Sequence, residues 1–214
     1  KKRVKDILKE NIKESTIYVR GQKIDFTASS PKNKIDKGFE ILIEDIYHKL
    51  NYISEHINSD KELFDLINKD NIRLTLNKED ANQLAYDEMQ HYLESQAQRK
   101  NRITLKNVID NFKGIPYGWK QKDIVSLIIK LMKAKEINLQ YNGEIIGIDN
   151  DRLPEYFTKR SMFEKLVIKK REKVDQEFIN KAKKLGRDLF EKTDLTSDED
   201  KLKKKKKKLI NNNL

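Results

Sequence analysis

The stretch Ile115-Pro116-Tyr117-Gly118-Trp119 carries the strongest fold signal in this 214-residue chain, because it holds the only Trp and one of the three Pro. An apolar helical pattern follows it, from about 120 to 134. Residues 137–146 then alternate apolar and polar side chains around Asn142-Gly143. Asn-Gly between such runs is the strongest short-range hairpin signal, since both central turn residues need positive φ.

Another helical pattern precedes the turn. Thr104 can cap a helix that runs to about Phe112, and Gly114 and the following Pro stop it. Helix, turn, helix and hairpin in this order are typical of a winged helix, which we expect over residues 99–150. Four residues are predicted to form its structural turn: Pro116, Tyr117, Gly118 and Trp119. We expect Trp119 to be a core anchor, and the alternative is a base-stacking surface.

Composition bounds the class of protein. With 36% hydrophobic and 38% charged residues the chain can form a small core. Cysteine is absent and no apolar run approaches the roughly 20 residues that cross a bilayer, which excludes disulfides, thiol catalysis and membrane insertion. A cytoplasmic location is expected. The start at Lys1-Lys2-Arg3, without Met, suggests a piece of a longer polypeptide.

The formal net charge of +11 is unevenly distributed. Residues 1–150 carry +3, residues 151–200 carry +1, and the last 14 residues carry +7. The run Lys203 to Lys208 repels itself, so we expect it to be solvated. The nearly balanced body makes attraction of the whole domain to phosphates a weak argument.

Residues 1–98 are expected to form a helical region with an N-terminal β-hairpin. A helix is predicted over 2–13 and a hairpin over 16–26. Three- and four-residue apolar steps predict a long helix over 33–56, which we expect to be the spine of the fold. Ser59 is predicted to cap a short helix.

The next helix is expected to begin near Asn77, after an extended piece at 72–76, and to run to about Gln98. Residues 99–102 follow as a basic linker and mark the domain boundary.

Residues 151–200 are expected to form a helical C-terminal region, and 201–214 a lysine-rich tail. Within this region, 163–168 has two interpretations: Ser161 with Glu164 favours a capped helix, whereas Val167-Ile168 favours a strand. A final helix is predicted from Asp175.

Signals of catalysis are missing from the sequence. The seven Gly form no GxxxxGK[ST] phosphate loop, and no G-x-S-x-G nucleophile motif occurs. His48, His56 and His91 have no metal-ligand spacing. We therefore expect no catalytic residue, no cofactor-binding residue and no metal site in this segment.

The helix after the turn tests a DNA-binding interpretation. A recognition helix exposes a polar, mostly basic face. Here the apolar residues between 124 and 132 cover an arc of about 200° at 100° per residue, so only a narrow strip is left for solvent. Such a helix suits burial better. The candidate nucleic-acid-binding residues are Arg99, Lys100, Arg102, Lys122, Lys130 and Lys133.

The block 112–119 and the stretch 123–143 resemble the region beyond the nucleotide-binding core of the large P-loop ATPase of BREX phage-defence systems, the BrxC or PglY type. Further stretches fit the same family: Tyr18-Val19-Arg20-Gly21-Gln22, Tyr47-His48-Lys49-Leu50, Tyr156-Phe157-Thr158-Lys159-Arg160 and Lys173-Val174-Asp175. The resemblance covers nearly the whole chain, but only the Pro-Tyr-Gly-Trp block is specific. The lysine run replaces an expected mixed helix.

The resemblance implies a role in bacterial defence against phage, with an ATPase parent acting on or near DNA beside a methyltransferase and other system members. ATP and Mg²⁺ are then expected only in the part of the parent outside this segment, because the family's nucleotide-binding motifs have no matching positions here.

We therefore predict a mainly α protein with small β-hairpins: a helical domain, a winged-helix-like unit and a helical C-terminal region. The predicted function is a noncatalytic interaction or assembly module of a BREX-type ATPase, with other BREX proteins or further copies of itself as partners and no membrane. The alternative is a DNA-binding winged-helix module that contacts duplex phosphates.

Overall fold

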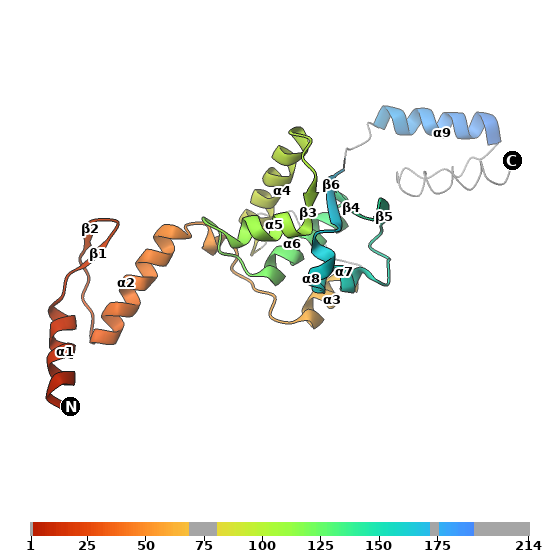
Figure 1. Ribbon diagram of the computed structural model, residues 1–214. Coiled ribbons are helices and arrows are strands. Elements are labelled where there is room, and N and C mark those ends of the chain that lie inside the picture. Colours follow the sequence, from red (N-terminus) through yellow and green to blue (C-terminus); the bar gives the residue numbers. More distant parts are fainter. Residues whose placement is uncertain (1, 69–80, 172–175, 191–214) are drawn as a thin grey trace. The chain divides into compact units, whose positions relative to one another are not determined.

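The computed structural model describes residues 2–68, 81–171 and 176–190 (Figure 1). The chain divides into two compact units, residues 1–170 and 171–214. Within the described residues the elements are α1 (Lys2–Glu14), β1 (Ile17–Val19), β2 (Gln22–Ile24), α2 (Pro31–Ile46), the 3-10 helix η1 (Leu50–Tyr52), α3 (Asp60–Asn68), α4 (Gln83–Gln98), β3 (Ile103–Thr104), α5 (Leu105–Lys113), α6 (Gln121–Lys133), β4 (Ile137–Tyr141), β5 (Glu144–Ile146), α7 (Leu153–Thr158), α8 (Arg160–Phe163), β6 (Leu166–Lys170) and α9 (Gln176–Phe190). The protein is mainly helical, as predicted.

The core of the first unit forms around α6. This helix contacts α3, α4, α5 and β4, and nine of its thirteen residues are buried. An antiparallel sheet in the order β3-β6-β4-β5 completes the core. Hydrophobic burial is therefore concentrated on the helix that the sequence pattern marked as apolar over a wide arc.

Local signals around this core are confirmed. The Thr104 side chain accepts from the Asn107 main chain, and Asn107 reaches back to Thr104, which forms a capping box at the start of α5. The β4–β5 hairpin turns at Asn142 and Gly143 with φ of 51° and 87°. Positive φ at both positions is what a two-residue hairpin turn of this type requires.

The sheet extends past the expected unit of 99–150. Strand β6 lies between β3 and β4, with Ile168 opposite both Ile103 and Leu139. The four-stranded sheet therefore takes a central strand from the region expected to be helical. Segment 163–168, for which two interpretations stood open, contains both the end of α8 and the start of β6.

The prediction of a helix over 33–56 is wrong in its second half, because α2 ends at Ile46. Tertiary contacts take over there: the Lys49 main-chain nitrogen donates to Pro116 O at 3.1 Å. The same helix is not the spine. Gly38 is its only buried residue, where a Cβ would come 3.0 Å from Ile17 of β1.

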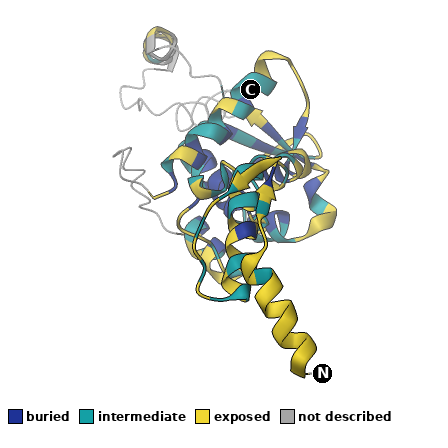
Figure 2. Ribbon diagram, turned by 90° about the vertical axis from the view of Figure 1, so that its left-hand side faces the viewer, coloured by how far each residue is buried: buried dark blue, intermediate teal, exposed yellow. Residues whose placement is uncertain are grey.

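The predicted helix over 2–13 and hairpin over 16–26 are confirmed as α1 and the β1–β2 pair. Helix α1 buries none of its described residues, and Figure 2 shows it exposed along its length. Ser59 caps α3, with its Oγ accepting from Glu62 N at 3.2 Å. Helix α4 begins at Gln83, and the expected start at Asn77 and the extended piece 72–76 lie outside the described residues.

In the second unit, α9 lies where a C-terminal helix was predicted, while its expected cap Asp175 and the lysine-rich tail lie outside the described residues. No helix among 2–68, 81–171 and 176–190 combines the length and the apolar character that a bilayer span requires.

Candidate functional site

The turn between α5 and α6 is held by an aromatic cluster. Trp119 is 2% exposed and stacks on Phe112, with ring centroids 4.8 Å apart and planes 3° apart. Its indole Nε1 donates to Lys49 O at 2.9 Å. A buried Trp with a satisfied N–H acts as an anchor. The prediction that Trp119 clamps the turn into the core is confirmed.

Tyr117 adds a polar contact to the same cluster. Its hydroxyl donates to Glu88 Oε1 at 2.7 Å, and Lys49 Nζ binds the same carboxylate oxygen. Burial alone would raise the pKa of Glu88, but the hydrogen bonds from Lys49 and Tyr117 outweigh it and hold the pKa below its usual value. Burial and the contact with Glu88 raise the pKa of Tyr117. The turn is therefore fastened to α4 by the Tyr117–Glu88 hydrogen bond, and the same carboxylate pairs with Lys49.

Gly118 is required by its backbone and its surroundings. Its φ is +66°, and a Cβ at this position would lie 2.9 Å from the Tyr47 ring. Only glycine combines left-handed φ with such a close approach. The Pro-Tyr-Gly-Trp block thus ties the end of α2 to the winged-helix core.

Residues 49–58, which we call the strap, run over the core and are anchored at three places. The first is Lys49, at the Pro116 and Trp119 contacts described above. The second is Asn82, whose Oδ1 accepts from the main-chain nitrogens of Ser54 and Glu55 at 2.9 and 3.0 Å. The third lies on α6.

That third anchor is Asp123, in the first turn of α6. The side chain is 2% exposed, its Oδ1 accepts from Ile57 N at 2.7 Å, and its Oδ2 lies 2.7 Å from His56 Nδ1. In helix-turn-helix proteins the N-terminal residues of the recognition helix contact base edges. Here the strap and α3 occupy that position, so α6 is covered where a DNA-reading helix is open.

The structure separates the six candidate cations. Lys122 forms an ion pair with Asp60 at 3.1 Å, and its Nζ also donates to Asn58 O, at the end of the strap, at 3.3 Å. Lys130 and Lys133 are half-buried on α6. Arg99, Lys100 and Arg102 are exposed where α4 passes into β3. The candidates therefore do not form one surface.

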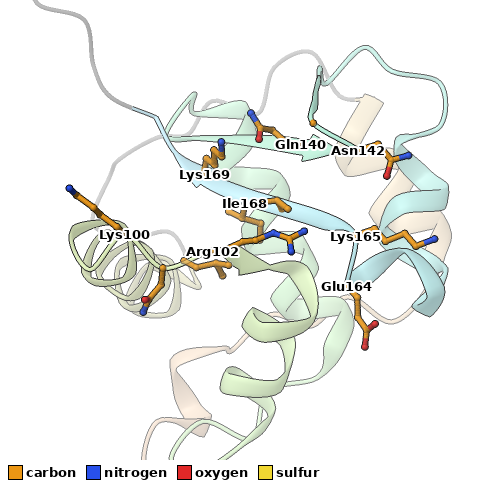
Figure 3. A pocket seen from close by; sticks show the side chains of 12 residues that line it. Lys100, Arg102, Gln140, Asn142, Glu164, Lys165, Ile168 and Lys169 are labelled. Atoms are coloured by element: carbon orange, nitrogen blue, oxygen red, sulfur yellow. The ribbon is translucent and has the colours of Figure 1, made fainter.

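Lys100 and Arg102 belong to a different arrangement, a concave surface over the outer side of the sheet with a cavity volume of about 550 Å³ (Figure 3). We call it the basic sheet face and define it by six exposed or half-exposed lining residues: Lys100, Arg102, Gln140, Asn142, Lys165 and Lys169. Sequence reasoning missed Lys165 and Lys169. The available signal was the strand alternative for 163–168, which places both on the side of β6 opposite to Leu166 and Ile168.

Among the described residues, no group of three or more His, Cys, Asp or Glu is arranged to hold a metal ion.

Helix α4, strand β3, helices α5 and α6 and strand β4 follow the order of a winged-helix domain, with β6 in the sheet position beside β3. The core is therefore a winged-helix domain with an insertion of β5, α7 and α8 between its last two central strands. A family model described as the winged helix-turn-helix domain of the BREX ATP-binding protein BrxC matches residues 49–172. A second, described as the BrxC fourth domain with a six-stranded β-sheet, matches residues 1–42. The chain belongs to the BREX BrxC family. No solved structure matches the chain.

Proposed function

We propose that this segment is a noncatalytic assembly module of a BrxC-type ATPase. In this module a closed winged-helix core carries an N-terminal arm, residues 1–46. The arm docks onto the rest of the BrxC fourth domain. The observation that carries the proposal is the occupied first turn of α6. Asp123 is buried there and holds the strap through Ile57. Reading DNA with α6 would require the strap and α3 to leave, which would expose apolar surface.

The arm supplies the interaction surface. The matched fourth domain is described with a six-stranded sheet, whereas the described residues within the match contribute β1 and β2. We infer that the other strands come from elsewhere in a longer polypeptide. The arm is then one part of a domain whose core is shared with those strands.

Exposed apolar side chains on the arm support this inference. They lie at three- and four-residue steps along α1 and α2, which places them on one face of each helix. They are Val4, Ile7, Leu8, Ile35, Phe39 and Ile43, each more than 40% exposed. Contiguous exposed apolar side chains mark a surface that another element covers.

DNA contact through α6 has less support. Lys122 is already paired with Asp60, and the helix is buried on most of its circumference. The phosphate-contact role of Lys130 and Lys133 stays a prediction. As members of a BREX system, proteins of this family act with other BREX components, and we propose the exposed surface of this segment as one of their contacts.

The docking proposal is tested by comparing one substitution in two contexts. Phe39→Ser is expected to leave the stability of this chain unchanged, because the ring is 58% exposed. In a longer polypeptide that contains the whole fourth domain, the same substitution is expected to lower the free energy of unfolding by about 1.5–3 kcal/mol. Ile145→Ser, at a 66% exposed site outside the arm, is the control and should be neutral in both. A neutral Phe39→Ser in the longer polypeptide would refute docking.

A further inference from the structure

We propose that the basic sheet face binds the phosphodiester backbone of double-stranded DNA. This site does not include α6. The assembly role proposed above depends on the arm and the strap, so the two proposals can fail independently. The argument rests on the sheet register, the uncompensated charge, one like-charge pair and one left-handed residue.

The register places the cations on one side of the sheet. Ile103, Leu139 and Ile168 share a row and are buried, so their neighbours along each strand face the other way. One residue beyond the Ile103–Ile168 pair, Arg102 comes opposite Lys169. At the other end of β6, one residue beyond the Tyr141–Leu166 pair, Lys165 comes opposite Asn142.

The charge of this face is not compensated within the described part of the chain. Lys100, Arg102, Lys165 and Lys169 are all exposed, and no carboxylate of a described residue lies within ion-pair distance of any of them. The carboxylate that does line the cavity, Glu164, is bound by Lys106. In a body that is otherwise almost charge-balanced, four such cations make a local positive field.

Two features of the face work against folding stability. Like charges directly opposite each other on neighbouring strands are destabilising, as Arg102 and Lys169 are. Lys100 has φ of 56°, a left-handed conformation that favours glycine. Lys100 follows the C-cap of α4. Its N–H donates to Ala97 O, and the N–H of the next residue, Asn101, donates to Gln96 O. Local conflicts of this kind are expected at functional sites.

The dimensions and chemistry favour a nucleic-acid backbone over a single anion. Lys165, directly before β6, and Lys169 within it are four residues apart, which is about 13 Å at 3.3 Å per residue. That length spans about four phosphates of one strand along the axis of B-DNA. The amides of Gln140 and Asn142 beside them are of the type that donates to phosphate and sugar oxygens. In Figure 3, Lys100 and Lys165 lie at opposite sides of the view, with β6 between them.

Fluorescence anisotropy of a labelled 20-bp duplex tests the proposal. The full chain is used with Lys203 to Lys208 replaced by serine, so that the terminal lysine run does not contribute. Four phosphate contacts predict a log-log salt slope of about −3.6. The double variant Arg102→Thr, Lys169→Thr is expected to show a slope of about −1.8 and affinity reduced about tenfold or more. Threonine suits a strand and removes the cross-strand repulsion, so the variant should fold at least as stably.

Two controls make the outcome decisive. Lys5→Thr with Lys9→Thr, at exposed sites on α1, removes the same amount of charge outside the basic sheet face and should leave the slope and affinity unchanged. A labelled polyglutamate peptide of matched charge should bind at least about tenfold more weakly than the duplex, because it offers no phosphate or sugar oxygens to Gln140 and Asn142. Unchanged duplex binding in Arg102→Thr, Lys169→Thr, or equal binding of polyglutamate, would overturn the proposal.

Discussion

Asp123 Oδ1 accepts a hydrogen bond from the main-chain nitrogen of Ile57 at 2.7 Å, across 66 residues of sequence. This contact fixes the strap to the first turn of α6. The contact explains why α6, which occupies the position of a recognition helix, is covered at its N-terminus in this protein. The carboxylate of Asp123 points into the core and stabilises the fold.

Removing that carboxylate should weaken the protein. Asp123→Ala leaves the partly buried Ile57 N–H without its acceptor, and we expect the free energy of unfolding to fall by about 1–3 kcal/mol. Asp123→Asn keeps an oxygen acceptor and should lose less. Urea unfolding followed by circular dichroism measures both. Asp110→Ala, at an exposed site on α5, is the matched control. A loss in Asp123→Ala no larger than in Asp110→Ala would contradict the anchoring role.

Two substitutions separate the contributions of Trp119 to stability, from ring stacking and from its hydrogen bond. Trp119→Phe keeps an aromatic ring against Phe112 but leaves Lys49 O without a donor, so we expect a loss of about 1–3 kcal/mol. Trp119→Ala should lose about 3–5 kcal/mol. Because this is the only Trp, its fluorescence reports burial directly. Strong quenching by acrylamide in the native protein would be incompatible with a core position.

Gly118 and Gly143 form a natural pair for comparison. Both have positive φ, but a Cβ on Gly118 meets Tyr47 at 2.9 Å, whereas Gly143 has nothing within 4 Å. Both substitutions to Ala should destabilise through backbone strain, and Gly118→Ala should cost more because the Tyr47 ring must also move. Thermal unfolding of the two variants measures the difference. Equal losses would show that the Tyr47 contact does not constrain the turn.

Glu88 should contribute to the pH dependence of stability. Burial acts to raise its pKa, but the hydrogen bonds from Lys49 and Tyr117 hold the pKa in the folded protein below the usual value of a glutamate. A lowered pKa means that the contribution is present above pH 4.5 and is lost as the pH falls through the folded value. The stability difference between wild type and Glu88→Gln should therefore shrink on going from pH 7 to pH 3. In a Lys49→Met background the difference at pH 7 should already be smaller. If the stability difference between wild type and Glu88→Gln grew at low pH, the pKa of Glu88 would be raised rather than lowered in the folded protein.

Lys100 should show a conflict between stability and binding. Lys100→Gly relieves the left-handed strain and is expected to stabilise the fold by up to about 1 kcal/mol, while it removes one cation of the basic sheet face. Lys135 has φ of 58° after the α6 C-cap, outside the basic sheet face, so Lys135→Gly makes the same backbone change without removing a cation of that face. Denaturation and duplex anisotropy on both variants separate the effects. Weaker duplex binding in Lys135→Gly than in Lys100→Gly would contradict the assignment of the site.

Local signals in the sequence identified much of the structure. The Thr104 cap, the Asn142-Gly143 turn and the anchoring of Trp119 were all predicted, because each depends on residues close in sequence or on one dominant preference. The wide apolar arc of α6 likewise predicted burial. These features follow from short-range backbone chemistry and hydrophobic periodicity.

Long-range pairing could not be read in the same way. The insertion of β6 between β3 and β4, the early end of α2 and the seating of the strap on Asn82 and Asp123 depend on which distant segments meet, and sequence spacing does not encode that choice. The basic sheet face is a consequence of the same pairing, since Arg102 and Lys169 come together only when β6 pairs with β3. Helix periodicity indicates that α6 must be covered, but three-dimensional packing decides which segment covers it. The polar groups of the strap find partners 27 to 70 residues away in the sequence.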